Sequence, residues 1–250
     1  MRCGAVLLAA GATDAVDVAV VSADDAEDAA FRLERGAGGL ALVALQDPSL
    51  GTLSLDFERG SVGWRGGERA RGERLVRACR AGAEPSPRIV DGTGGLGTDA
   101  WLLASAGAQV HVVEQHPVLR ALLADALERA AAFAPRVCAR LSLSGGDTRR
   151  GVGALAPDVL YLDPMYPPRR KRALGDRRLR FVGALLAADG FAGDDAAGLV
   201  RAGLAAAVPR VVLKVPRKVR LEGVPAPHHS LQGRSTRFDV WISPRVAAAH

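Results

Sequence analysis

Cysteine is scarce in this sequence, and the three cysteines that occur are scattered. Cys3, Cys79 and Cys138 form no C-x-x-C pair and have no histidine partner at the spacing of a zinc site. An odd, sparse set of thiols argues against a disulfide framework and is typical of reduced cysteines in the cytoplasm. We therefore expect no disulfide, no bound metal and a cytoplasmic location.

Long apolar runs are also missing. No stretch approaches the roughly 18 consecutive apolar residues that suggest a membrane helix, so the sequence predicts no membrane span. The apolar opening at residues 3–12 is short, has one arginine before it and leads into acidic segments. These features favour a first β-strand over a signal peptide.

Lysine is rare, yet the chain is basic. Only Lys171, Lys214 and Lys218 are lysines, whereas lysine and arginine together number 33 against 27 acids, which leaves a net charge of +6. An arginine-rich composition is what a GC-rich genome produces. The composition by itself therefore indicates no partner, and the position of the charge matters more.

The positive charge is concentrated in one segment. Residues 169–180 read R-R-K-R-A-L-G-D-R-R-L-R, with seven basic residues and one acid, a local excess of +6 that equals the excess of the whole chain. A concentrated basic segment is the electrostatic footprint of a partner with a phosphate backbone. The candidate phosphate contacts are Arg169, Arg170, Lys171, Arg172, Arg177 and Arg178.

Residues 1–82 are expected to form a small α+β lobe. Its pattern predicts two helices and two strands separated by glycine-rich turns, the helices at residues 24–35 and 72–81 and the strands at 40–45 and 52–57. Pro85 and Pro87 mark a junction. A second domain is expected over residues 83–250.

From residue 88 the rhythm changes to alternating strands and helices. Strands are predicted at residues 89–91, 109–114, 141–144, 158–162, 210–215 and 238–242, and helices at 97–106, 117–132 and 196–207. This alternation predicts an α/β domain with a mostly parallel sheet and helices on both faces. Ligands of such sheets bind at the carboxyl ends of the strands, where the strand order reverses.

A glycine-rich loop lies between the first strand and helix of this domain. Residues 90–100 read V-D-G-T-G-G-L-G-T-D-A, and Gly92, Gly94 and Gly97 satisfy G-x-G-x-x-G. Glycines allow a tight turn and a close approach of the backbone to a ligand. Because the chain holds 29 glycines, the pattern alone is weak, and a turn without a ligand is the alternative.

Acidic residues around the loop favour S-adenosylmethionine over a nicotinamide dinucleotide. Glu114 ends the next predicted strand and could accept hydrogen bonds from ribose hydroxyls, which both cofactors offer. Asp91 enters the loop itself, where a carboxylate would repel a pyrophosphate at a helix N-terminus but suits an amino group and a sulfonium. Asp99, in the first helical turn, adds to that field or stabilises the helix dipole.

The fourth predicted strand of this domain ends in a candidate catalytic tetrapeptide. Asp163, Pro164, Met165 and Tyr166 resemble the D/N-P-P-Y/F motif of methyltransferases that modify exocyclic amines. Such an amine is a poor nucleophile because its lone pair is delocalised into the ring. The Asp163 carboxylate and the carbonyl near Pro164 could accept its two N–H groups, while Tyr166 stacks on the base. An ordinary Asp-Pro turn with a packing tyrosine is the alternative.

These motifs together resemble the ribosomal RNA small subunit methyltransferase J family. The resemblance rests on V-D-G-T-G-G-L-G-T-D-A, V-E-Q-H-P-V, Y-L-D-P-M-Y-P with the basic stretch after it, V-V-L-K-V-P and G-R-S-T-R-F-D-V-W. It implies a class I methyltransferase fold, Rossmann-like, with helices on both faces of the sheet and a small N-terminal α+β lobe. It also implies methylation of a guanine N2 in 16S ribosomal RNA, with the RNA or the small ribosomal subunit as partner.

The resemblance further implies a set of contacts to S-adenosylmethionine. These fall on Thr98, Asp99, Glu114, Gln115, Asp147, Thr148 and Asp163. The acid after the third strand of this fold often meets the adenine amino group, although Asp147 could equally be a turn carboxylate. Lys214, at the end of a predicted strand, could contact either the substrate or a carboxylate.

Three other functions fit parts of the pattern. The tetrapeptide suits an adenine-N6 or DNA amino-methyltransferase as well as a guanine enzyme, and only the resemblance selects guanine. A non-catalytic RNA-binding protein could use the same fold, but the intact acids and Tyr166 argue against it. A nicotinamide dehydrogenase is disfavoured because no persuasive His/Arg pair for hydride transfer is present.

Overall fold

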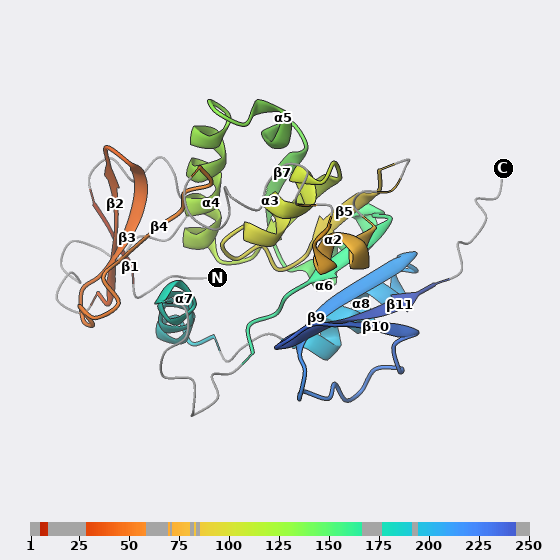
Figure 1. Cartoon of the computed structure of the whole chain (residues 1–250). Coiled ribbons are helices and arrows are strands. Elements are labelled where there is room, and N and C mark those ends of the chain that lie inside the picture. The colour runs from red at the N-terminus through yellow and green to blue at the C-terminus, as the bar shows by residue number, and fades with distance from the viewer. Residues whose placement is uncertain are drawn as a thin grey trace. The chain divides into compact units, whose positions relative to one another are not determined.

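The computed structural model describes residues 6–9, 29–58, 70, 72–80, 83, 86–166, 177–191 and 195–243. The chain forms two units that interleave along the sequence (Figure 1). We call residues 1–56, 116–129 and 165–194 the small-sheet unit, and residues 57–115, 130–164 and 195–250 the large-sheet unit. The division into lobes at residues 82 and 83 stays a prediction.

The large-sheet unit is built on seven strands in the order β10-β11-β9-β8-β5-β6-β7. Strands β5 to β9 run parallel to one another, whereas β11 runs antiparallel to both β9 and β10. Strand β5 pairs with β6 on one side and β8 on the other, so the strand order reverses there. The bounds are β5 Arg88–Asp91, β6 Gln109–Glu114, β7 Leu141–Gly145, β8 Val159–Leu162, β9 Arg210–Pro216, β10 His229–Gln232 and β11 Thr236–Ile242.

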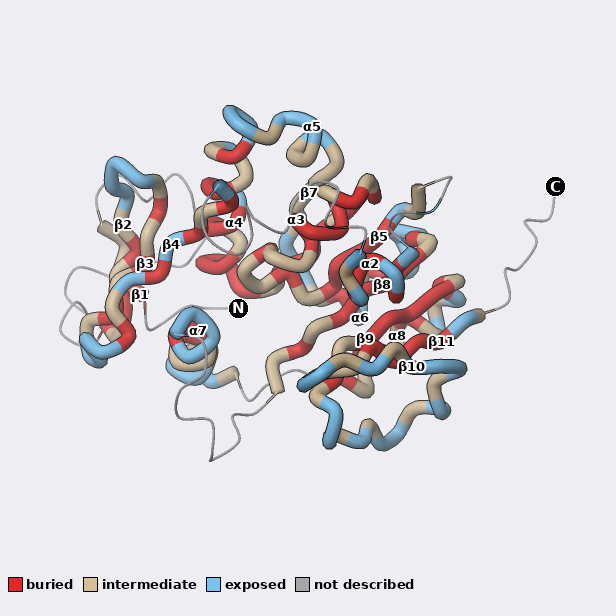
Figure 2. Tube along the Cα trace, viewed as in Figure 1, coloured by how far each residue is buried: buried red, intermediate tan, exposed pale blue. Residues whose placement is uncertain are grey.

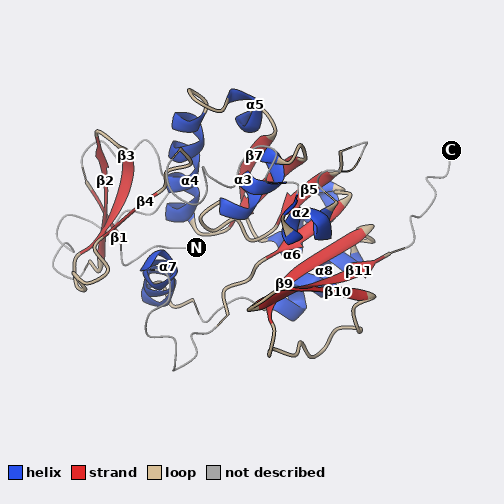
Figure 3. Cartoon of the chain, viewed as in Figure 1, coloured by secondary structure: helices blue, strands red, loops and turns tan. Residues whose placement is uncertain are grey.

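Helices cover both faces of this sheet, as the alternating pattern predicts (Figure 3). Consecutive side chains of a strand point to opposite faces. The Arg210 guanidinium donates to the carbonyl of Ala78 in α2, whereas Val211 packs against Gly203 in α8, so these two helices lie on opposite faces. The helices of the unit are α2 Arg74–Cys79, α3 Thr98–Ser105, α5 Pro135–Cys138, α6 Thr148–Leu155 and α8 Ala196–Ala205.

The central strands form the core of the large-sheet unit (Figure 2). All four residues of β8 are buried, as are Ile89, Val90 and Asp91 in β5. Strands buried on both faces read as continuous apolar runs, and this explains why V-L-Y-L and R-V-V-L-K-V were recognisable as strands from the sequence. The single lysine in the second run, Lys214, is the exception that bears on function.

Among its described residues, the small-sheet unit contains a four-stranded sheet in the order β1-β2-β3-β4 and two helices. Phe31 of β2 contacts Phe181 of α7, with ring centroids 5.4 Å apart. Asp125 of α4 accepts from the Leu40 amide and from the guanidiniums of Arg35 and Arg129, which ties that helix to the sheet. The bounds are β1 Val6–Leu8, β2 Phe31–Gly36, β3 Gly39–Ala44, β4 Thr52–Ser54, α4 Pro117–Ala130 and α7 Arg177–Ala188.

The helix predicted over residues 24–35 is wrong from residue 31 onward, because β2 occupies Phe31–Gly36. Phe31 and Leu33 are buried while Arg32 and Glu34 are not, which is the two-residue period of a strand. The alanine- and acid-rich stretch before it favours a helix by propensity, and residues 24–28 lie outside the described part of the chain. Pairing with β3 outweighs that local preference.

Candidate functional site

The glycine loop leaves the carboxyl end of β5 and approaches β6 closely. The Gly94 amide donates to the Val113 carbonyl at 3.0 Å, and a Cβ at position 94 would lie 2.7 Å from Val112 Cγ1. Gly97 precedes α3 with a φ of 70°, a conformation that strains any other residue. The loop is therefore held against the sheet, and its glycines are required by packing as well as by any ligand.

Glu114 ends β6 beside this loop. It is 6% exposed, and its Oε2 accepts the Gly95 amide at 2.6 Å. A carboxylate that accepts a backbone N–H is fixed in position while each oxygen retains further lone pairs. Glu114 thus links β6 to the loop and presents an acceptor group at the carboxyl edge of the sheet.

Asp91 is the most deeply buried acid of the loop. Only 2% of the residue is exposed, and its Oδ1 accepts the Thr93 amide at 3.1 Å. Burial raises the pKa of Asp91 to about 8, an effect that the Thr93 hydrogen bond opposes and that the negative charges of Asp99, Asp163 and Glu114 reinforce. Several carboxylates therefore share this edge of the sheet, which is a strongly negative environment.

The raised pKa of Asp91 predicts a specific dependence of stability on pH. A carboxyl whose pKa is about 8 when folded, against a usual 3.8, holds a proton in the folded state and loses it on unfolding. Its contribution to the free energy of unfolding is therefore full below about pH 4 and is lost as pH rises toward about 8. Chemical denaturation of the cofactor-free protein, compared with Asp91→Asn, measures this.

The wild type should lose stability relative to Asp91→Asn between about pH 5 and 8. The difference between the two proteins isolates this residue, because all other titrating groups are common to both. A difference that does not change with pH would contradict the buried, protonated state of Asp91.

A second group of side chains surrounds Asp163, directly after β8. The Lys214 ammonium lies 2.8 Å from Asp163 Oδ2 and 2.8 Å from Asp99 Oδ2, and so bridges two carboxylates from different elements. The Asp163 amide donates to the Thr93 hydroxyl at 2.7 Å, and the Tyr161 hydroxyl donates to Asp99. Asp163 is therefore held at both its backbone and its side chain.

The electrostatic state of this group follows from burial and pairing. Burial by itself lowers the pKa of Lys214, but Asp99 and Asp163 outweigh it and raise that pKa, so the ammonium stays charged. Burial, followed by the charges of Asp99, Asp163 and Asp91, raises the pKa of the Tyr161 hydroxyl. Tyr161 is thus a neutral hydrogen-bond donor, and Lys214 is the cation of the cluster.

Asp147 and Thr148 follow β7 at the same edge. Thr148 is buried, and its hydroxyl donates to the Gly92 carbonyl at 2.7 Å, which ties α6 to the glycine loop. Asp147 is the N-cap of α6 and accepts from the Arg149 amide and guanidinium, and these bonds lower its pKa. The hydrogen bonds of Asp147 are therefore those of a turn carboxylate that caps a helix.

Most of the predicted site residues lie at the carboxyl ends of neighbouring strands. Thr98 begins α3, Gln115 is half-buried after β6, and Pro164 is buried after β8. Tyr166 is half-buried in the segment that follows, within the small-sheet unit. Arg177 and Arg178 are exposed in the first turn of α7, whereas Arg169, Arg170, Lys171 and Arg172 lie outside the described residues.

The sequence did not predict the roles of three residues in this cluster. Thr93 and Tyr161 lie inside recognised motifs but were not singled out, and Lys214 was left between two roles. A charged residue in the otherwise apolar strand V-V-L-K-V was the available signal, because a buried lysine needs an acidic partner.

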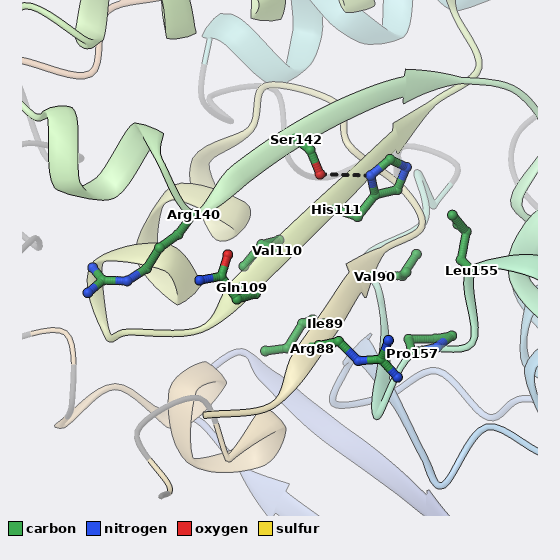
Figure 4. A pocket seen from close by; sticks show the side chains of 10 residues that line it. All are labelled: Arg88, Ile89, Val90, Gln109, Val110, His111, Arg140, Ser142, Leu155 and Pro157. Atoms are coloured by element: carbon green, nitrogen blue, oxygen red, sulfur yellow. Dashed lines mark hydrogen bonds between the residues drawn. The ribbon is translucent and has the colours of Figure 1, made fainter. Parts of the chain in front are cut away.

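A shallow pocket lies at the opposite edge of the sheet. It is formed around the amino-terminal ends of β5, β6 and β7, where His111 contacts the hydroxyl of Ser142 (Figure 4). None of the predicted site residues lines it. We place no chemistry there, because the carboxylates and the glycine loop all lie at the carboxyl edge.

The described part of the chain offers neither a metal site nor a membrane helix. No group of three or more histidine, cysteine or acidic residues there is arranged to hold a metal ion. No helix among these residues is both long enough and apolar enough to cross a membrane. Within the same part, Cys79 is a buried free thiol and Cys138 is half-buried.

Comparison with known proteins gives consistent relatives. A family model described as "Putative SAM-dependent methyltransferase" matches residues 17–243. A ribosomal RNA small subunit methyltransferase J from Pseudomonas aeruginosa is 40% identical, covering 88% of this chain and 85% of the relative. The protein of the same name from Tolumonas auensis is also 40% identical, covering 86% and 87%.

A solved structure covers nearly the whole chain. The crystal structure of a SAM-dependent methyltransferase from Neisseria gonorrhoeae is similar with a TM-score of 0.69 and 27% sequence identity. The match covers 98% of this chain and 97% of the other. The two chains therefore share their fold over nearly their full lengths.

Proposed function

The chain belongs to the ribosomal RNA small subunit methyltransferase J family, and on that premise we propose that it methylates the exocyclic N2 of a guanine in 16S ribosomal RNA. The predicted class I, Rossmann-like fold is confirmed, and the protein is a methyltransferase that uses S-adenosylmethionine. The guanine N2, the small ribosomal subunit as partner and a cytoplasmic location are parts of the proposal.

One observation carries the chemistry. Asp163 follows the buried strand β8 and is held by the Thr93 hydroxyl at its amide and by the Lys214 ammonium at its carboxylate. A fixed acceptor at the carboxyl edge of the sheet is what a weakly nucleophilic amine requires. An ordinary Asp-Pro turn would not need a partly buried lysine reaching from β9.

The residues around the glycine loop fit S-adenosylmethionine. This cofactor carries a positive sulfonium and an ammonium, and the loop is ringed by Asp91, Asp99 and Glu114. Gly94 lies so close to β6 that a side chain there would clash. We propose that Glu114 binds the ribose hydroxyls and that Asp91 and Asp99 meet the cationic end, whose positive charge favours the ionised form of Asp91.

The remaining cofactor contacts are proposed from their placement at the same edge. Gly92, Gly94 and Gly97 shape the loop, and Thr148 holds it through the Gly92 carbonyl. Thr98 and Gln115 directly follow the loop and β6. We propose that Asp147 meets the adenine amino group from its N-cap position, and that Asp163 borders both cofactor and substrate.

The proposed mechanism rests on orientation. When bound, S-adenosylmethionine supplies an electrophilic methyl carbon on its sulfur. The Asp163 carboxylate and the Pro164 carbonyl accept the two N–H bonds of the amine and direct its lone pair toward that carbon. Methylation of the amine would leave the nitrogen with one proton to lose, and the Asp163 carboxylate would accept it.

The RNA partner is proposed from aromatic and basic residues. Tyr166 stacks on the target base, which must be unpaired or swung out of a helix to reach the site. Arg169, Arg170, Lys171, Arg172, Arg177 and Arg178 neutralise phosphates beside it. Arg177 and Arg178 are exposed on α7.

Mass mapping of modified nucleosides tests the proposed function. Ribosomal RNA from a strain that lacks this protein should lose one N2-methylguanosine from 16S RNA and no other modification. The wild-type gene should restore the methyl group, whereas a gene carrying Asp163→Ala should not. Loss of an N6-methyladenosine would instead support the adenine alternative, and an unchanged map would overturn the proposal.

A further inference from the structure

We propose that a second basic surface, made by Arg217, Lys218, Arg220 and Arg234, grips the phosphate backbone of the substrate RNA at the rim of the catalytic edge. We call these four residues the rim patch. This inference rests on the proposed RNA substrate and deepens it. The four residues come from the loop after β9 and from the turn between β10 and β11, so no continuous basic run marks them in the sequence.

Backbone hydrogen bonds bring the two segments together. The Arg217 amide donates to the Ser235 carbonyl at 3.1 Å, directly after the paired residues Pro216 and Thr236. The Gly233 amide donates to the Thr236 carbonyl at 2.8 Å and closes the turn that carries Arg234. Arg217 and Arg234 therefore belong to neighbouring strand ends of one sheet.

The rim patch has a rigid base. The Arg237 guanidinium donates to the Asp239 carboxylate and also to the Arg217 carbonyl at 2.9 Å, which pins the end of β9 to β11. The Val219 amide donates to the Pro216 carbonyl at 2.8 Å and fixes the turn that follows. Because the backbone is already ordered, only side-chain freedom is lost when a partner binds.

The patch lies at the same edge as the catalytic cluster. Lys214 of β9, which contacts Asp163, precedes Arg217 by three residues, and Arg217 directly follows the end of that strand, so the two lie at most roughly 10 Å apart along the chain at 3.3 Å per residue. A backbone phosphate beside a base held at Asp163 falls within this distance. The predicted basic segment after β8 is separate from the patch in sequence and belongs to another unit.

The charges of the patch are exposed and uncompensated. All four side chains belong to exposed residues, and within the described part of the chain none of them forms an ion pair. Arg237 on the same hairpin is instead neutralised by Asp239. Glu222 is the one acid in the loop between β9 and β10, against three basic residues there.

The rim patch would offset the negative charge of the catalytic edge. The catalytic edge holds the carboxylates of Asp99, Glu114 and Asp163, and Lys214 is the cation that bridges Asp99 and Asp163. These carboxylates suit a cationic cofactor but repel a polyanion. Cations at the rim of the site compensate that repulsion and draw the phosphate backbone toward it.

Neutralising the patch tests the inference. The patch variant carries Arg217→Gln, Lys218→Gln, Arg220→Gln and Arg234→Gln. The control variant replaces four arginines away from the patch with glutamine, namely Arg77, Arg80, Arg136 and Arg140. Both lose the same charge. Binding of unmodified 16S RNA is measured over a range of KCl concentrations, together with the KM for RNA and calorimetric binding of S-adenosylmethionine.

The patch variant should bind RNA more weakly and raise the KM for RNA, and the slope of log affinity against log salt should shrink by about 0.7–0.9 for each lost contact. Cofactor affinity and melting temperature should match the control. If the patch variant and the control bind RNA alike while the wild type methylates it, the rim patch is overturned and the proposed function stands. If the wild type neither binds nor methylates the RNA, both fall.

Discussion

Replacing Asp163 with alanine is expected to lower kcat by about 10²- to 10³-fold, the usual cost of removing one preorganised electrostatic contact to a transition state. The carboxylate is held by Lys214 at 2.8 Å, and the backbone amide of the same residue by Thr93 at 2.7 Å. The substitution removes the carboxylate and leaves the backbone bond in place. Affinity for S-adenosylmethionine should change less than tenfold, because Glu114 and the glycine loop remain intact.

Single-turnover methylation and calorimetry separate the two effects. Asp158→Ala is the matched control, since Asp158 lies just before β8 at the opposite end of the strand from Asp163. It should retain kcat within a small factor. A variant at position 163 that loses cofactor binding but keeps its rate at saturating cofactor would refute the proposed role in orienting the amine.

Replacing Lys214 with methionine is expected to lower kcat by about 10- to 100-fold, the range for losing a hydrogen bond to a charged group. Lys214 is a positioning residue in this proposal, because it acts through Asp163 and Asp99. The lower end of the range applies, since about a third of the Asp163 side chain is exposed and water screens the pair.

Cofactor affinity distinguishes positioning from a general structural role. Loss of Lys214 removes a positive charge beside the proposed binding site of a cationic cofactor, so its affinity should be unchanged or higher while kcat falls. Lys214→Arg should restore part of the rate, because the guanidinium keeps the charge with a different geometry. Equal losses of cofactor affinity and kcat in Lys214→Met, without rescue by arginine, would show that the residue only supports folding.

Much of the fold was predictable because its signals are local. Strand β8 is a continuous apolar run and β6 and β9 are rich in valine, and the glycine loop and helix α3 follow β5 with their own turn residues. The misassigned helix over 24–35 shows the limit of such signals. Residues 31–36 become a strand through pairing with β3, which no local propensity reveals.

Strand β10 and helices α6 and α7 were not predicted, each for a different reason. His229–Gln232 has three exposed residues and no apolar alternation, and it is a strand only because β11 pairs with it. Helix α6 is a short, arginine- and glycine-containing segment whose start is set by the Asp147 cap. Helix α7 begins inside the basic segment, whose closely spaced charges hide the apolar period of a helix.

The sequence by itself determined the fold class, the cofactor and the reaction type, because each depends on residues adjacent in the chain: the glycine loop, Glu114 at a strand end, and Asp163 with its tetrapeptide. Only the tertiary structure decided the role of Lys214, which meets Asp99 and Asp163 across 115 and 51 residues of sequence. It likewise joined Arg217 to the turn of Arg234 through the pairing of β9 and β11. Contacts between distant residues arise from sheet pairing and burial, and no local pattern encodes their partners.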